Sequence, residues 1–400
     1  MAETVYEAIV VGVGAMGSAA LYQLAKRGKR VLGIDQFAPP HTLGSSHGDT
    51  RITRQAVGEG AAYVPLVMRS HELWREIEAQ TGDDLYTVTG GLIIGREHQQ
   101  TRHHGKENFV QQTIKLASQF QIAHEVLRVA EIKRRFPPFN LHGDEIGYYE
   151  PLAGFLRPEN CIRAQLKLAE RFGATLQTNT KVQGIEVTNN GLCTVITSQG
   201  RFTAEKVIIS AGAWVKDFLG AEYANFINIY RQVLYWFDVS ANYAAFTPEV
   251  CPIYIWMFGE ADDEYLYGFP AIDGVQGGLK IAAEQMETST DPDTVSRTVT
   301  AEETDAMYRR YVAPQFPSVS NQCVKAATCF YTVTPGSRFI IDQHPAHPQV
   351  IVASPCSGHG FKHSAAIGEV LADLVTTGSS KIDLAPFSFA QVIGTPTQSA

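Results

Sequence analysis

Three glycines near the N-terminus constrain the fold more than any other feature of this chain. Gly12, Gly14 and Gly17 form a G-x-G-x-x-G pattern directly after residues 8–11, an apolar and partly β-branched run typical of a buried parallel strand. The first glycine permits a tight turn, the second lets a pyrophosphate approach the backbone, and the third lets a helix pack on the strand. Apolar residues at helical spacing then lead to Gly28, which ends the predicted helix.

An acidic residue follows at the place where a nucleotide ribose would lie. Asp35 ends the apolar run 31–35 and lies 18 residues after Gly17. A carboxylate at this point can accept hydrogen bonds from ribose hydroxyls, while the amides and dipole at the helix N-terminus favour phosphates. A lone G-x-G-x-x-G occurs in ordinary tight turns, but here strand, helix and acid stand in the expected order. The segment therefore predicts a Rossmann-type dinucleotide-binding unit.

Composition limits the class of protein. A length of 400 residues favours two domains, and a net charge of −8 argues against a nucleic-acid-binding surface. The sequence contains no run of about 18 apolar residues that could span a membrane and no signal-peptide pattern, so we expect a cytoplasmic protein. Its six cysteines form no C-x-x-C pair and no zinc spacing; we expect no metal site, and most of the thiols should be buried.

A polar loop and a second glycine turn are the other candidate site segments. Arg51 and Arg54 lie in a long loop after the second strand, and on a helical turn they would face the same way. Near the C-terminus an apolar strand, the turn 357–360 and a helix follow one another. The amides of Gly358 and Gly360 could stabilise an anionic ring. Lys362 follows in the first helical turn, beside an apolar helix face, which favours a site role over an exposed lysine.

The pattern predicts an α/β fold whose dinucleotide domain is discontinuous, because its strand–turn–helix units stand at both ends of the chain. Aromatic, β-rich runs within 227–283 predict a mostly antiparallel sheet between them. We expect a Rossmann-type domain formed by residues 1–88, 150–220 and 322–392. An α+β substrate domain would comprise residues 89–149 and 221–321.

Several short blocks, in this order along nearly the whole chain, resemble one family. They are G-x-G-x-x-G, GDTRITR at 48–54, AGAW at 211–214, YGFP at 267–270, TCFYT at 328–332 and SGHGFK at 357–362. The sequence resembles the family of monomeric sarcosine oxidase and N-methyltryptophan oxidase, which belongs to the glutathione-reductase-like flavoproteins. The resemblance implies that the dinucleotide is FAD and that the protein is a monomer. It also implies that the enzyme oxidises small amino acids that are secondary or tertiary amines and reduces O2 to hydrogen peroxide.

The resemblance also implies roles for individual residues. Cys329 matches the cysteine that forms a thioether to the flavin, and Lys280 matches the lysine that serves O2 activation. Arg54 and Lys362 match the pair that holds the substrate carboxylate. The aromatic residues that line the amine pocket match Tyr267 and Tyr331. The other cofactor contacts implied, together with the glycines and Asp35 above, are Ser46, His47, Thr50, Arg51, Val182 and Gly212.

The chain departs from the family pattern at one position of chemical importance. The family usually has a histidine four residues after the oxygen-site lysine, and this chain has Glu284. An anion there could attract a basic substrate, act as a base, or point into solvent, and the sequence leaves these possibilities open. The candidate catalytic residues are therefore Lys280, Arg51 and Glu284. Smaller departures are Ser46-His47 in place of a histidine pair, and Leu21 at a position that is often small.

The function predicted from these matches is an FAD-dependent oxidase of a secondary amino acid, either N-methyl or cyclic. A hydride equivalent would pass to flavin N5, and O2 would become H2O2. One alternative is a flavin amine dehydrogenase, or an amino-acid oxidase that uses another amine. Because the opening motif alone also fits other dinucleotides, an NAD(P)-dependent dehydrogenase is a second alternative. A non-catalytic flavin-binding protein is a third.

Overall fold

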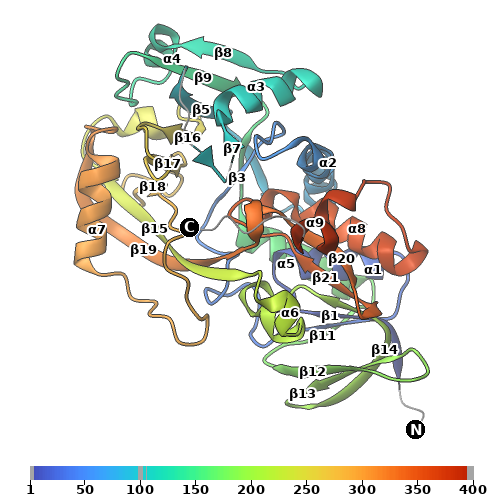
Figure 1. Ribbon diagram of the computed structural model, residues 1–400. Helices are drawn as coiled ribbons and strands as arrows, with labels where there is room; N and C mark the ends of the chain where they lie inside the picture. The colour runs from blue at the N-terminus through green and yellow to red at the C-terminus, as the bar shows by residue number, and fades with distance from the viewer. Residues whose placement is uncertain (1–3, 98–101, 105, 394–400) are drawn as a thin grey trace.

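The computed structural model describes residues 4–97, 102–104 and 106–393. Its architecture is α/β, with two eight-stranded sheets that each combine segments far apart in the sequence (Figure 1). The predicted combination of a Rossmann-type sheet with a mostly antiparallel sheet is confirmed. No helix of the described residues combines the length and apolarity needed to cross a membrane.

The first sheet is built around the strand that precedes the glycine motif. Its strands are β1 (Val5–Val11), β2 (Val31–Ile34), β11 (Thr175–Gln177), β12 (Val182–Val187), β13 (Cys193–Thr197), β14 (Gly200–Ile209), β20 (Ile340–His344) and β21 (His347–Ser354). Strand β1 lies between β2 and β14 and is parallel to both, while β11 pairs parallel with β2 on its other side. The long strand β14 pairs with β13 along its first half and with β21 along its second half. Strands from both ends of the chain therefore share one sheet.

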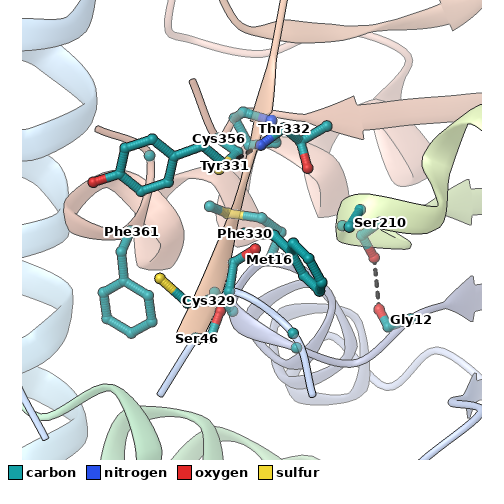
Figure 2. Close-up of a pocket in the computed structure, with 18 of the residues that line it drawn as sticks. Gly12, Met16, Ser46, Ser210, Cys329, Phe330, Tyr331, Thr332, Cys356 and Phe361 are labelled. Carbon is teal, nitrogen blue, oxygen red and sulfur yellow. Dashed lines mark hydrogen bonds between the residues drawn. The ribbon is translucent and has the colours of Figure 1, made fainter. Parts of the chain in front are cut away.

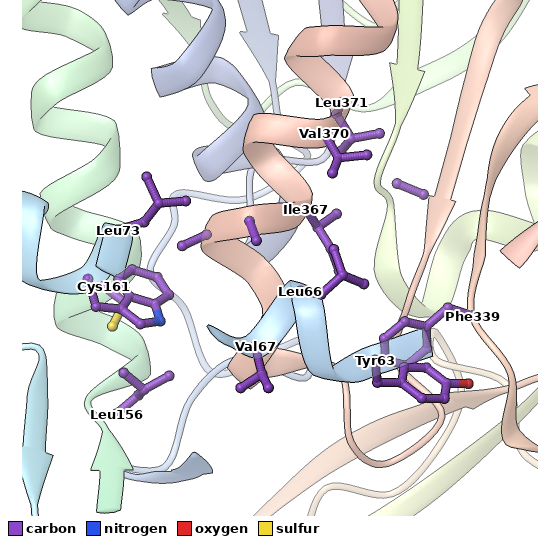
Figure 3. Close-up of a cluster of buried hydrophobic side chains, with 14 of the residues drawn as sticks. Tyr63, Leu66, Val67, Leu73, Leu156, Cys161, Phe339, Ile367, Val370 and Leu371 are labelled. Carbon is purple, nitrogen blue, oxygen red and sulfur yellow. The ribbon is translucent and has the colours of Figure 1, made fainter. Parts of the chain in front are cut away.

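Four helices cover one face of this sheet. They are α1 (Ala15–Lys26), α2 (Val64–Thr81), α5 (Pro158–Arg171) and α8 (Ser364–Thr377). Leu66 of α2 and Ile367 of α8 point into the shared core, where Tyr63 and Phe339 also meet (Figure 3). Fully burying one such aliphatic side chain contributes about 1.5–3 kcal/mol. As predicted, α1 starts just after the glycine turn, and Gly28 takes a left-handed φ of +73° where the helix ends.

The second sheet lies beside the first and is antiparallel except where β16 pairs with β5 (Figure 1). In spatial order its strands are β19 (Val319–Val333), β15 (Asn228–Val239), β18 (Leu279–Ala282), β17 (Tyr265–Gly268), β16 (Ile253–Met257), β5 (Gly91–Arg96), β9 (Glu145–Glu150) and β8 (Glu125–Arg128). Alternate side chains of these strands, among them Tyr254 and Trp256, form a core rich in aromatic rings, and Phe316, which precedes β19, packs into it. Strand β19 pairs with β15 over most of its length.

Short elements complete the fold. The small strands are β3 (Arg51–Thr53), β4 (Tyr86–Val88), β6 (Arg102–His103), β7 (Lys106–Glu107) and β10 (Gly154–Leu156). The remaining α-helices are α3 (Phe109–Gln119), α4 (Val129–Arg135), α6 (Ala221–Ala224), α7 (Ala301–Met307) and α9 (Phe389–Ile393), and a π-helical turn, Tyr308–Val312, continues α7. The 3-10 turns are Ala61–Tyr63, Gly212–Phe218, Tyr243–Phe246, Pro335–Ser337, Phe361–His363 and Ala385–Phe387. The chain passes repeatedly between the two large sheets, and the residue bounds of the two predicted domains stay a prediction.

Candidate functional site

One continuous pocket runs from the glycine turn after β1 to the glycine turn after β21 (Figure 2). Residues of both large sheets line it. Of the predicted site residues, those in its lining are Gly12, Gly14, Asp35, Ser46, Arg51, Arg54, Val182, Gly212, Tyr267, Glu284, Cys329, Tyr331, Gly358, Gly360 and Lys362. Four other predicted residues stand outside this lining, namely Gly17, His47, Thr50 and Lys280.

The N-terminal end of the pocket is a rigid turn with one open face. A Cβ at Gly17 would stand 1.8 Å from the Gly12 carbonyl oxygen, so helix α1 can approach β1 only through a glycine. A Cβ at Gly14 would meet no atom within 4 Å, which leaves its backbone open to the pocket. The Ser210 hydroxyl donates to the Gly12 carbonyl at 2.7 Å (Figure 2). Asp35 accepts a hydrogen bond from the amide of Val13 at 2.8 Å, and burial raises the pKa of this carboxyl.

The arginine loop is extended rather than helical. Residues 51–53 form strand β3, so the helical turn considered for Arg51 and Arg54 is absent. Both side chains nevertheless line the pocket. The Arg51 guanidinium donates to the carbonyls of Ser45 at 2.7 Å and Thr50 at 2.8 Å, which holds the loop curled around it.

Lys280 lies against the same loop. Its Nζ donates to the carbonyl oxygens of Gly48 at 2.6 Å and Thr50 at 2.9 Å, and to the Thr50 hydroxyl at 3.1 Å. The ammonium also lies 4.6 Å from the centre of the Phe269 ring. Burial, together with the charge of Arg51, lowers the pKa of Lys280 well below its usual value. The loop and this lysine therefore fix each other's position.

The two predicted carboxylate-binding cations have different surroundings. Arg54 forms a buried ion pair of 2.9 Å with Glu59 and also donates to the Ala56 carbonyl, while its Nε is buried without a partner. Lys362 donates to the carbonyl of His359 at 2.7 Å. Among the described residues, no carboxylate oxygen lies within 4.0 Å of the Lys362 nitrogen. Burial lowers the pKa of Lys362 to about 8, although the charge of Glu59 raises it.

Glu284 points into the wall of the pocket and not into solvent. Its side chain is 5% exposed, and it accepts hydrogen bonds from His104 at 2.9 Å, Tyr331 at 3.0 Å and Tyr265. Burial raises the pKa of Glu284, but the charge and hydrogen bond of His104 outweigh this and lower it to about 2. A carboxyl with this pKa is a poor base at neutral pH. Tyr267 joins the same wall, with its hydroxyl 3.4 Å from that of Tyr331.

His104 and Glu59 are site residues that sequence reasoning missed. His104 lies in a polar segment and Glu59 lies among small and apolar residues, and neither stretch has a periodicity or a motif that indicates a site. Nδ1 of His104 lies 3.3 Å from Glu59 and Nε2 lies 2.9 Å from Glu284. Burial lowers the pKa of His104, but the charge and hydrogen bond of Glu284 raise it to about 9.

The pocket separates the six cysteines into two groups. Cys329 on β19 and Cys356 after β21 line it, while the other four thiols lie elsewhere in the fold (Figure 2). The sulfur of Cys356 accepts a hydrogen bond from the amide of Thr332 at 3.4 Å. Burial raises the pKa of both thiols. The fold therefore reduces six candidate thiols to two, and the choice of Cys329 still depends on the resemblance.

Comparison with known proteins gives consistent results over nearly the whole chain. Residues 7–374 match the family described as FAD dependent oxidoreductase. Monomeric sarcosine oxidase of Streptomyces avermitilis is 41% identical over 392 residues, which cover 98% of this chain and 99% of that protein. N-methyl-L-tryptophan oxidase of Yersinia pestis is 33% identical over 393 residues, with coverage of 96% and 99%.

Solved structures share the fold. NikD, described as an unusual amino acid oxidase, superposes with a TM-score of 0.81 at 21% identity, covering 96% of this chain and 97% of its own. L-proline dehydrogenase from P. horikoshii gives a TM-score of 0.79 at 22% identity, again with coverage of 96% and 97%. These likenesses confirm the predicted fold.

Proposed function

We propose that this chain, which belongs to the family of FAD-dependent oxidoreductases, is an oxidase of secondary amino acids whose amine is N-methylated or part of a ring. Its relatives are named sarcosine oxidase and N-methyl-L-tryptophan oxidase, and these names support this substrate class. Membership in the family sets aside the NAD(P)-dependent alternative. The single observation that carries the proposal is Lys362, a buried lysine of the pocket lining with no carboxylate oxygen within 4.0 Å of its nitrogen in the described parts of the chain.

The pocket fits FAD along its length. The open backbone of Gly14 at the N-terminus of α1 suits a pyrophosphate, and Asp35 stands where a ribose would lie. Further along the lining, the hydroxyls of Thr332 and Ser354 are buried and have no hydrogen-bond partner among the residues that the structure describes. Since unpartnered buried polar groups are destabilising, these hydroxyls indicate a polar ligand. When bound, FAD supplies the redox chemistry, accepting a hydride equivalent from the carbon next to the amine and passing the electrons to O2.

The chain's own residues would bind and orient the substrate. Lys362 would hold the substrate carboxylate as a point charge, and the unpartnered Nε of Arg54 would donate a second hydrogen bond. Tyr267 and Tyr331 would line the space for the amine. Lys280, a cation fixed against the loop beside Arg51, would stabilise the anions formed as O2 is reduced. We further propose that the protein acts as a monomer in the cytoplasm, with the domain bounds stated above.

A panel of amines tests the proposed substrate class. Purified holoenzyme is mixed with N-methylglycine, N-methyltryptophan, proline and pipecolate, with glycine and alanine as primary-amine controls. We expect the secondary amino acids to reduce the flavin and to yield hydrogen peroxide in equal amount to the amine oxidised. The Lys362→Met variant should lose affinity for these substrates and keep its flavin. If none of the secondary amino acids bleached the flavin under anaerobic conditions, the proposal would be wrong.

The electron acceptor separates an oxidase from a dehydrogenase. An oxidase consumes O2 at least as fast as it reduces an added dye, because Lys280 favours the anionic products of O2 reduction. We expect Lys280→Met to slow reoxidation by O2 while anaerobic flavin reduction by N-methylglycine changes little. Equal slowing of both half-reactions would show that Lys280 acts in general folding or flavin binding. Fast reaction with the dye and slow reaction with O2 in the unmodified protein would favour the dehydrogenase alternative.

Two cysteine variants test covalent attachment of the flavin. We propose a thioether between the cofactor and Cys329. Acid precipitation should then leave yellow colour in the protein pellet of the unmodified enzyme and of Cys356→Ser, the matched control from the same pocket. It should release all the flavin from Cys329→Ser. Retention of flavin by Cys329→Ser, or its loss from Cys356→Ser alone, would assign the bond to the other thiol.

A further inference from the structure

Both nitrogens of His104 face carboxylates, which fixes the protonation of this ring. Nδ1 lies 3.3 Å from Glu59, and Nε2 lies 2.9 Å and 3.2 Å from the two oxygens of Glu284. An ionised carboxylate only accepts hydrogen bonds, so each ring nitrogen has to carry a hydrogen. His104 is therefore a buried imidazolium, and it holds the Glu284 carboxylate in one orientation.

The carboxylate of Glu284 already accepts from three donors, one of which, the N–H on Nε2 of His104, is shared between its two oxygens. A carboxylate offers about four acceptor sites. Oε1 accepts from Tyr331 at 3.0 Å and from His104 at 3.2 Å, while Oε2 accepts from His104 at 2.9 Å and from Tyr265. Glu284 therefore acts on the pocket through the groups that donate to it.

The group through which it acts is the hydroxyl of Tyr331. Because Glu284 only accepts, the Tyr331 hydrogen points to the carboxylate. One lone pair of the Tyr331 oxygen then faces the Tyr267 hydroxyl at 3.4 Å, and the other is left for a donor on a ligand. Donation to a charged acceptor makes that oxygen a stronger acceptor itself. Tyr331 and Glu284 both line the pocket, whereas Tyr265 is outside the lining. A Cβ at Gly358 would stand 2.9 Å from Nε2 of His104 and 3.3 Å from Oε1 of Glu284, so the pair packs on the C-terminal glycine turn.

We propose that His104 is a positioning residue that, through Glu284, makes the Tyr331 oxygen a fixed hydrogen-bond acceptor, so that the pocket selects ligands with an N–H over ligands of the same shape that have none. The selection rests on the proposed function in one respect, since the N–H in question is that of a secondary amino acid. Tertiary amines in the free-base form and ethers of matching size are disfavoured because they offer no donor to the lone pair that Tyr267 does not use. Such a loss amounts to about tenfold or more in affinity.

Two isosteric ligands that are not amino-acid substrates test the proposal without turnover. Pyrrole-2-carboxylate has an N–H where furan-2-carboxylate has an oxygen, and binding of each to the holoenzyme is read from the change in flavin absorbance. We expect the unmodified protein to bind the pyrrole about tenfold more tightly or better. In turnover, kcat/KM should be higher for N-methylglycine, which has an N–H as the free base, than for N,N-dimethylglycine, which has none.

The variant Glu284→Gln should change the Tyr331 hydroxyl from a hydrogen-bond acceptor for the ligand into a donor. The amide oxygen would take the place of Oε2, where His104 and Tyr265 donate, and the amide nitrogen would replace Oε1 opposite Tyr331. That nitrogen donates to the Tyr331 oxygen, so the hydroxyl hydrogen turns into the pocket. The furan should gain affinity and the pyrrole should lose it. His104→Gln, which can donate to only one of the two carboxylates, should weaken the preference without reversing it.

Tyr331→Phe is the control that isolates the hydroxyl. It should bring the two affinities close together, and adding Glu284→Gln to it should then leave their ratio unchanged. Tyr265→Phe removes a different donor from Glu284, outside the pocket lining, and should keep most of the preference for the pyrrole.

Several outcomes would overturn the inference. Equal weakening of both ligands by Glu284→Gln would give the pair a structural role only, and so would an undiminished effect of Glu284→Gln in the Tyr331→Phe background. If Glu284→Gln fails to retain flavin, His104→Gln and Tyr331→Phe decide the question by themselves. An enzyme that oxidises none of the amino acids but binds pyrrole over furan would contradict the proposed function and support the selection. An enzyme that oxidises the secondary amino acids but binds the two ligands equally well would support the proposed function and contradict the selection.

Discussion

Arg51 and Lys362 are cations of the pocket lining that have no carboxylate oxygen within 4.0 Å among the described residues, whereas other charged groups of the lining are paired. Arg54 is paired with Glu59, and His104 with Glu284. Arg51 is bonded to backbone carbonyls, and Lys362 to the carbonyl of His359. A carboxylate ligand therefore meets Lys362 as a cation that does not first have to leave an acidic partner. If Lys362 holds the substrate carboxylate as proposed, its protonation is the main control on carboxylate binding.

The pKa of Lys362 predicts how binding depends on pH. Burial lowers this pKa to about 8, and only the protonated amine attracts a carboxylate. The affinity for furan-2-carboxylate, which has no amine to titrate, should be constant below about pH 8 and fall roughly tenfold per pH unit above it. Above about pH 9, where His104 loses its proton, the preference for pyrrole-2-carboxylate over the furan should weaken. Absorbance titrations of the flavin measure the affinity at each pH.

A matched variant distinguishes Lys362 from the other groups. Lys362→Arg keeps the positive charge at all accessible pH values, because a guanidinium does not deprotonate. The pH dependence of its affinity for furan-2-carboxylate should lose the step near pH 8, whatever the absolute affinity. A constant affinity of the unmodified protein up to about pH 9.5 would contradict the assignment of the step to Lys362.

At the scale of elements, helices α1 and α8 bring the two glycine turns together. Each helix starts at one of the turns, and the two helices pack on each other at Ala19 and Gly368. A Cβ at Gly368 would lie 2.3 Å from the Ala19 Cβ and 2.5 Å from its carbonyl carbon. The backbones approach so closely there that only glycine fits. The two ends of the pocket therefore depend on this helix crossing for their separation.

Gly368→Ala tests the helix crossing. The added methyl would push α8 away from α1, and overpacking of this kind typically lowers the free energy of unfolding by about 1–3 kcal/mol. Gly184→Ala is the control, because a Cβ at that strand position would meet no atom within 4 Å. Its effect should stay within about 0.5 kcal/mol. Thermal unfolding of the flavin-loaded proteins compares the two, and equal Tm values would show that the helices move apart at no cost.

At the scale of the whole molecule, one pocket joins the two large sheets. Strand β19 belongs to the antiparallel sheet, yet it carries Cys329 and Tyr331 to the lining, two residues apart and thus on the same side of the strand. The first sheet contributes the glycine turns at the other side. A ligand that fills the pocket therefore contacts both halves of the molecule, and its binding should stabilise them together.

The Cys329→Ser protein, after its non-covalently bound FAD has been removed, allows this coupling to be measured. Added FAD should raise its Tm, since a ligand at a hundredfold excess over its Kd contributes about 2.7 kcal/mol to stability. The thermal unfolding transitions followed by near-ultraviolet and by far-ultraviolet circular dichroism should coincide and should shift together when FAD is added. Cys356→Ser, which is expected to keep its flavin covalently, should show no shift when FAD is added. Two transitions, one of them insensitive to FAD, would show that the sheets unfold independently.

The features that sequence predicted correctly are those that depend on near neighbours. The glycine motif, the strand before it and the helix after it lie within thirty residues, and their physical requirements are local: a tight turn, a close helix approach and a capped helix end. The antiparallel nature of the second sheet could likewise be predicted, because β-rich runs broken by turn residues leave a local pattern. The resemblance added the family and the candidate residues along the chain.

Tertiary structure decided which charges meet. His104 contacts Glu59 and Glu284, which are 45 and 180 residues away, and nothing in the short polar segment around it indicates either partner. The sequence by itself determined a dinucleotide-binding fold and the family of this protein, because local backbone requirements and short motifs are written in consecutive residues. The fold alone decided the state of Glu284 and the partner of Arg54, because an ion pair depends on distance in space, and only the packed chain sets that distance.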